Sequence, residues 1–132
     1  MSEFTLKRKE MIKSKKTIDY LFGGGAKSFC VYPIRVVYKE QLDPNTSTHT
    51  LLVSVSKRKF KHAVDRNRVK RLIRESYRLN KNKLPETTLE SNKPLALAFI
   101  YLSDKIQPYA KVNEAIQKIL TLVAEETKSE NA

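Results

Sequence analysis

The chain of 132 residues carries 26 Lys and Arg against 14 Asp and Glu, a formal net charge of +12 at pH 7. Its single cysteine excludes an intrachain disulfide and a cysteine-based zinc site, and no apolar run is long enough to span a membrane. We therefore expect one cytoplasmic domain, residues 1–132, whose excess of positive charge favours a polyanion, above all nucleic acid, as its partner.

The N-terminal part predicts a basic lead-in and one short helix. The lead-in covers about residues 1–16, and Thr17 is a residue type that caps helices. Ile18 and Phe22 would share one face of this helix, and the glycine triplet at 23–25 would end it. A glycine triplet can also cradle a phosphate, but no Gly-Lys-Ser/Thr pattern follows, so we favour the helix stop.

Two strands are predicted next. Residues 29–39 alternate along the chain and are rich in β-branched and aromatic residues, which indicates a single strand. A turn signal at 43–45, Asp-Pro-Asn, predicts a hairpin that joins this strand to a second one at 50–56. One face of the first strand would carry Tyr32, Ile34 and Val36.

Residues 57–78 form the most informative segment, with ten Lys or Arg against two acids. Apolar residues recur at helical spacing from about Val64 to Leu79, so we expect an amphipathic helix that packs on the sheet. A helix face that is merely solvated usually carries both acidic and basic residues, whereas here almost no acidic residue neutralises the cations. We therefore favour nucleic-acid phosphate as their partner. The candidate contacts are Lys57, Arg58 and Lys61 before the helix, and Arg66, Asn67, Lys70, Arg71, Arg74 and Arg78 on it.

The C-terminal part predicts a buried strand and a last helix. A polar loop at 80–94 precedes an apolar strand at 95–102, and the segment after Pro108 repeats apolar residues at helical spacing. An acidic, frayed tail covers about residues 125–132. The order α-β-β-α-β-α predicts an α+β fold, a small two-layer α/β sandwich in which a β-α-β crossover carries the basic helix.

No group of residues predicts catalysis by the protein itself. His49 lies in a predicted loop and His62 in the basic run, without a carboxylate cluster that would place either as a general base. No zinc-ligand spacing is present, so we expect no metal site and no catalytic residue. The residues alone favour RNA or DNA binding, as in a ribosomal-type protein; a membrane binder is disfavoured because the chain has no Trp.

Two segments of the sequence resemble a known protein family. They are Ser54-Val55-Ser56-Lys57-Arg58 and Ala63-Val64-Asp65-Arg66-Asn67-Arg68-Val69-Lys70-Arg71-Leu72-Ile73-Arg74-Glu75. Together they closely resemble the bacterial ribonuclease P protein subunit, whose signature is an Arg-Asn-Arg element opening a helix that continues with Lys-Arg and a further Arg. The resemblance covers about residues 7–124.

The resemblance implies a function that composition alone does not. In this family a catalytic RNA removes the 5′ leader of precursor tRNA with the help of Mg²⁺. The Mg²⁺ is bound mainly by the RNA. We infer no obligate protein partner. The family's β-α-β crossover is left-handed. The resemblance adds Arg68 to the residues facing the catalytic RNA, and it implies a cleft for the single-stranded leader lined by Ile18, Phe22, Tyr32, Ile34 and Val36. Two departures from the family are Ile18, at a position that is commonly aromatic, and Leu52, where Gly is common.

Overall fold

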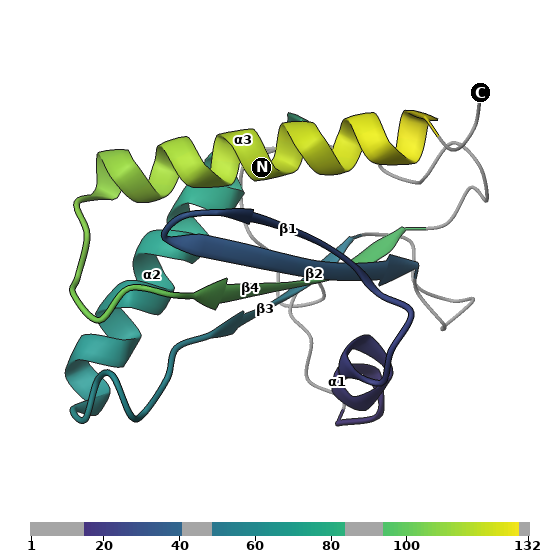
Figure 1. Ribbon diagram of the computed structural model, residues 1–132. Coiled ribbons are helices and arrows are strands. Elements are labelled where there is room, and N and C mark those ends of the chain that lie inside the picture. The colour runs from purple at the N-terminus through teal and green to yellow at the C-terminus, as the bar shows by residue number, and fades with distance from the viewer. Residues whose placement is uncertain (1–14, 41–48, 84–93, 130–132) are drawn as a thin grey trace, which may run out of the picture.

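The computed structural model describes residues 15–40, 49–83 and 94–129. In these ranges the chain forms a four-stranded sheet, three α-helices and one short 3₁₀-helix (Figure 1). The elements in chain order are α1 (Lys15–Phe22), β1 (Lys27–Val31), β2 (Ile34–Glu40), β3 (Thr50–Ser54), α2 (Ala63–Asn80), η2 (Lys81–Lys83), β4 (Leu95–Tyr101) and α3 (Tyr109–Ser129).

The sheet has the strand order β1-β2-β4-β3. The β1–β2 and β2–β4 pairs are antiparallel, whereas β3 runs parallel to β4. A parallel pair needs a long crossover, and α2 supplies it, so the predicted β-α-β unit with the basic helix is confirmed. The predicted α+β sandwich is confirmed as well: α3 and α1 lie on opposite sides of the sheet (Figure 1).

The two faces of the sheet bury unequal cores. Ile34, Val36 and Phe99 belong to the larger cluster, which packs against the apolar sides of α2 and α3. The opposite face is covered in part by α1, whose Leu21 packs against Val37 together with Ala96 and Ala98. Because successive strand residues point to opposite faces, β2, β3 and β4 divide their apolar side chains between the two clusters.

The segment 29–39 forms two strands instead of the single strand predicted. β1 and β2 pair as a hairpin that turns at Tyr32 and Pro33, joined by a cis peptide bond. Proline has no N–H for a strand ladder, so Pro33 interrupts the run that the alternation had joined. The carbonyl of Pro33 instead accepts a hydrogen bond from the N–H of Leu102 at 2.8 Å.

The predicted hairpin between the first and second strands is also wrong. β2 pairs with β4, and β3 lies on the far side of β4. The reason is the apolar character of β4, which is buried on both faces and therefore takes the central place between two neighbours. The turn signal at 43–45 itself lies outside the described residues.

The two long helices agree with their predicted periodicity. α3 begins just after Pro108, whose carbonyl accepts from the N–H groups of Lys111 and Val112. Contrary to the predicted frayed tail, α3 continues to Ser129, and Glu126 pairs with Lys27 of β1 at 3.3 Å. Among the helices that the structure describes, none is long and apolar enough to cross a bilayer.

Candidate nucleic-acid interface

Helix α2 turns an apolar side to the sheet and a basic side away from it. Val69, Ile73 and Tyr77 are buried, and the ring of Tyr77 packs against Phe99 of β4 with centroids 5.8 Å apart. These positions recur every four residues, so the opposite side of the helix faces outward. Among the predicted contacts, Asn67, Arg68 and Arg71 are exposed, and Arg66, Lys70, Arg74 and Arg78 are half-buried.

Arg66 differs from the other predicted contacts because its guanidinium is used within the protein. Its Nη1 donates hydrogen bonds to the carbonyl of Phe60 at 2.8 Å and to that of Lys61 at 3.0 Å. These bonds hold the loop before α2 against the helix. Arg66 therefore has a structural role that the sequence did not indicate.

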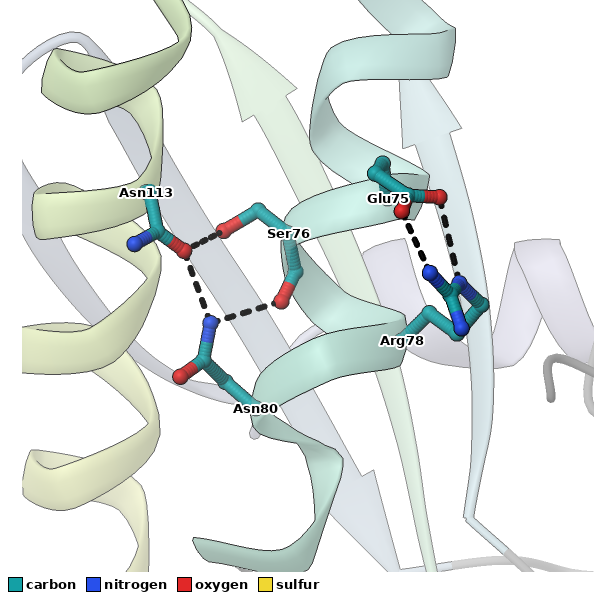
Figure 2. A network of polar contacts seen from close by, with 5 residues as sticks. All are labelled: Glu75, Ser76, Arg78, Asn80 and Asn113. Atoms are coloured by element: carbon teal, nitrogen blue, oxygen red, sulfur yellow. Dashed lines mark hydrogen bonds and ion pairs between the residues drawn. The ribbon is translucent and has the colours of Figure 1, made fainter. Parts of the chain in front are cut away.

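Arg78 forms an ion pair with a carboxylate on its own helix, as Figure 2 shows. Its Nε donates to Oε2 of Glu75 at 3.1 Å, and its second guanidinium nitrogen donates to Oε1. The hydrogen bond from Arg78 holds the pKa of Glu75 below its ordinary value. The positive charge at this end of the segment is thus partly compensated, whereas Arg68 and Arg71 form no ion pair with the residues that the structure describes.

Arg74 differs from both Arg66 and Arg78. It is half-buried, and its Nε is buried without a hydrogen-bond partner among the described residues. A buried donor that its own fold leaves unsatisfied is costly and uncommon in structural positions. Arg74 is therefore a cation that the packing of α2 alone does not explain.

The loop before α2 presents three further cations. The hydroxyl of Ser56 accepts from the backbone N–H groups of Arg58 at 3.1 Å and Lys59 at 3.4 Å, which turns the chain after β3. Lys57, Arg58 and Lys61 are exposed on this turn. These loop cations therefore directly precede the first turn of α2, where Arg66 contacts the carbonyl of Lys61.

A polar network between α2 and α3 fixes the orientation of the basic helix (Figure 2). Oδ1 of Asn113 accepts from the hydroxyl of Ser76 and from Nδ2 of Asn80, both at 2.8 Å. Asn80 also donates to the carbonyl of Ser76, and Gln117 donates to Oδ1 of Asn80 at 3.3 Å. Because Ser76 and Asn80 are buried, these bonds replace the water that both would otherwise keep.

Two residues of the predicted leader cleft belong to the core instead. Ile34 and Val36 are 0% exposed in the cluster covered by α2 and α3, so they cannot contact a ligand. Tyr32 is 56% exposed at the β1–β2 turn, with Nζ of Lys111 6.0 Å from its ring centroid. The seven residues of β2 place this turn roughly 20 Å from the end of the strand that α1 contacts. The alternation grouped Ile34 with Val36 correctly, but α2 and α3 cover their face of the sheet, whereas α1 covers the opposite face.

The α1 side of the sheet contains residues that the sequence reasoning missed. Nζ of Lys39 lies 4.2 Å from the ring centroid of Tyr20 and donates to the Tyr20 carbonyl at 2.7 Å, while the Tyr20 hydroxyl donates to the carbonyl of Glu40. Phe22 is 49% exposed, and Ile18 is half-buried. Arg35 and Lys39 lie on the face of β2 opposite Ile34 and Val36, as the alternation indicates, but that α1 covers this face became clear only from the packing of Leu21 against Val37.

Neither histidine forms a catalytic arrangement. Nδ1 of buried His49 accepts a hydrogen bond from the N–H of Leu95 at 2.8 Å, which ties the start of β4 to the start of β3. His62 is exposed at the N-cap of α2 and makes no side-chain capping bond. Within residues 15–40, 49–83 and 94–129, no three His, Cys, Asp or Glu side chains gather in a way that could hold a metal ion.

Comparisons with known proteins agree with this arrangement. A family model described as Ribonuclease P matches residues 6–123. A ribonuclease P protein component from Porphyromonas gingivalis is 41% identical over 121 residues, 92% of this chain and 88% of that protein. One from Syntrophus aciditrophicus is 39% identical over 83 residues, 63% of this chain and 66% of that protein.

Solved structures share the fold at lower sequence identity. The RNase P proteins from Staphylococcus aureus and Thermotoga maritima both match with a TM-score of 0.68 and 19% identity. The matches cover 86% of this chain and, respectively, 94% and 96% of those chains. The sheet order and the placement of the helices are therefore common to distant relatives.

Proposed function

Because the chain belongs to the ribonuclease P protein family, we propose that the outward side of α2 binds the RNA subunit of that enzyme. Membership assigns the chain to an endoribonuclease complex that removes the 5′ leader of precursor tRNA. Its partners are accordingly an RNA subunit and precursor tRNA. We expect this to take place in the cytoplasm, where precursor tRNA is matured.

One observation carries the proposal: Asn67, Arg68 and Arg71 are exposed together on the face of α2 opposite the core. One helical turn rises about 5.4 Å, so the row can follow successive phosphates of a folded RNA. Arginine suits this use because its planar fork can donate two hydrogen bonds to one phosphate. Lys57, Arg58 and Lys61 extend the same surface, and Lys70 and Arg74 flank it.

We propose further that the RNA subunit is the catalyst and that Mg²⁺ is bound mainly by RNA. On this proposal the protein's cations position the RNA and screen the repulsion between RNA subunit and substrate. His62, the exposed histidine nearest to this surface, has no carboxylate hydrogen-bonded to it among the described residues. A general base needs such a placed partner, which supports assigning the hydrolysis to the RNA.

The single-stranded leader would lie on the α1 side of the sheet. Exposed Phe22 and half-buried Ile18 offer apolar surface to unpaired bases, and Arg35 and Lys39 offer charge to the backbone. Arg35 and Lys39 take the place of Ile34 and Val36 in the proposed cleft. This arrangement puts the leader site and the RNA-subunit site on different elements of the fold.

Reconstitution tests the proposed function. The purified chain alone should cleave nothing, and at low Mg²⁺ and moderate salt it should restore processing of precursor tRNA by the RNA subunit. A leaderless tRNA serves as the control ligand, since it should bind the complex less tightly than the precursor. If the RNA subunit processes the precursor equally well without the protein under these conditions, the proposal is wrong.

A further inference from the structure

A pocket of about 550 Å³ opens beside the first turn of α2. Two loops form it: residues 58–62 between β3 and α2, and residues 104–106 between β4 and α3. The second loop is not part of the basic segment, and no sequence motif draws attention to it. Its cation, Lys105, lines the pocket together with Arg58 and Lys61 of the first loop.

The two loops are held in place by contacts on both sides of the pocket. The ring of Phe60, which lines the pocket, packs against Tyr101 of β4 with centroids 6.0 Å apart. Nζ of Lys59 donates to the carbonyl of Leu102, and Arg66 holds the carbonyl of Phe60 from the helix side. The pocket is therefore shaped before any ligand arrives, which lowers the entropic cost of binding.

The backbone of Lys105 is fixed while its ammonium group remains available. Its N–H donates to the hydroxyl of buried Ser103 at 3.1 Å, and its carbonyl accepts from the hydroxyl of Tyr101 at 2.7 Å. The Tyr101 oxygen also accepts from the N–H of Gln107 at 2.9 Å. Lys105 is exposed and forms no ion pair with the residues that the structure describes.

The charges around the pocket favour an anion. Its cations are Arg58, Lys59, Lys61 and Lys105, and its acids are Asp65 and Asp104. Asp65 lies in the first turn of α2, where a carboxylate is stabilised by the helix whatever the pocket binds. Four cations against two carboxylates leave a net positive site continuous with the exposed side of α2.

We propose that this pocket binds a phosphodiester group of the RNA subunit, held by Arg58 and Lys61 on one side and Lys105 on the other. The inference rests on the proposed function, and it adds the β4–α3 loop to the RNA-binding surface. A volume of several hundred cubic ångströms accommodates a nucleotide-sized group. The contact would fix where the RNA backbone passes the start of α2.

Three variants test the pocket through their affinity for the RNA subunit at several salt concentrations. Lys105→Ala should weaken binding about three- to tenfold and reduce the salt slope by about one. Asp104→Asn removes a repulsive carboxylate and should tighten binding a few-fold. Lys118→Ala is the matched control, because Lys118 lies exposed on α3 beside Glu114 and should change neither quantity.

The following results would overturn the inference. If Lys105→Ala behaves like Lys118→Ala, the RNA does not enter the pocket; if Asp104→Asn weakens binding, the pocket holds a cation instead of a phosphate. A wild-type chain that fails to bind the RNA subunit contradicts the proposed function itself. In that case inorganic pyrophosphate is titrated into the protein alone and followed by NMR, to test whether the pocket binds a phosphate group. Shifts of the Lys61 and Lys105 amide resonances would support binding, and unchanged resonances would refute it.

Discussion

The guanidinium of Arg66 donates a hydrogen bond to the carbonyl of Phe60 at 2.8 Å. This contact makes a member of the Arg-Asn-Arg element a structural residue that ties the loop at 57–62 to α2. The exposed residues that follow it, Asn67 and Arg68, make no such side-chain hydrogen bond within the part of the chain that the structure describes. RNA affinity lost at Arg66 would therefore reflect loop order as well as contact with RNA.

Replacing Arg66 with Ala should lower the free energy of unfolding. The change removes hydrogen bonds from a charged donor to two backbone carbonyls, a loss of about 1–2 kcal/mol. For a domain of this size that corresponds to a melting temperature lower by roughly 3–8 °C, measured by thermal denaturation. Arg71→Ala is the control and should melt like the wild type; equal melting of both variants would show that the Arg66 bonds contribute nothing.

Variants of Arg71 and Asn67 distinguish the contribution of charge from that of hydrogen bonding on the exposed side of α2. Arg71→Ala should weaken binding to the RNA subunit and make the salt dependence shallower by about one counterion, because a phosphate contact is lost. Asn67→Ala should weaken binding without changing that slope, because Asn carries no charge. Titrations at several salt concentrations measure both. An unchanged slope for Arg71→Ala would mean that Arg71 does not meet a phosphate.

Asn113→Ala should be strongly destabilising although Asn113 does not face the proposed RNA surface. The change removes the acceptor of the buried Ser76 hydroxyl and one of the two acceptors of the Asn80 amide, and the unsatisfied hydroxyl alone costs about 1–3 kcal/mol. Urea denaturation measures the loss. Glu114→Ala, on the exposed side of the same helix, should stay within about 0.5 kcal/mol of the wild type. Similar stability of the two variants would contradict the assigned role of the network.

Phe22 and Ile34 test the revised leader cleft. Phe22→Ala should leave stability nearly unchanged and reduce the preference for leader-bearing over leaderless tRNA by about 1–3 kcal/mol if a base stacks on this ring. Ile34→Ala should instead cost about 2–5 kcal/mol of stability, because it opens a cavity in the core. Competition binding and denaturation measure the two effects. The reverse pattern would restore Ile34 as a cleft residue and remove Phe22.

The basic helix could be predicted from the sequence because its signal is local. The spacing of Val69, Ile73 and Tyr77 determines which side is buried, and the charges must occupy the rest of the surface. The same holds for α3, whose buried apolar residues recur at helical spacing: Val112, Ile116, Ile119, Leu120 and Val123. Strand pairing is not local, so nothing near β2 indicated that β4 would become its neighbour.

The prediction of the leader cleft failed at a different step. The alternation grouped Ile34 with Val36 correctly, but it does not indicate which face of the sheet each helix covers. α2 and α3 cover the face of Ile34 and Val36, and α1 covers part of the other face, so both residues lie in the core. The structural role of Arg66 and the pocket that Lys105 shares with Lys61 also needed the structure, because each depends on loops that meet only after folding.

Glu75→Gln should tighten binding to the RNA subunit a few-fold at neutral pH. Glu75 is one of two acids in residues 57–78, and at pH 7 its charge opposes any phosphate near Arg78. Glutamine keeps one acceptor for the Arg78 guanidinium but removes the negative charge. The pKa of Glu75 is lowered in the folded protein, so the pair stabilises the fold above the ordinary Glu pKa and stops doing so as pH falls through the lowered value. The small stability difference between wild type and Glu75→Gln should therefore disappear in acid, while the gain in RNA affinity is measured at pH 7. Weaker binding by the variant would show that Glu75 orients Arg78 for the RNA, a role that the charge argument does not include.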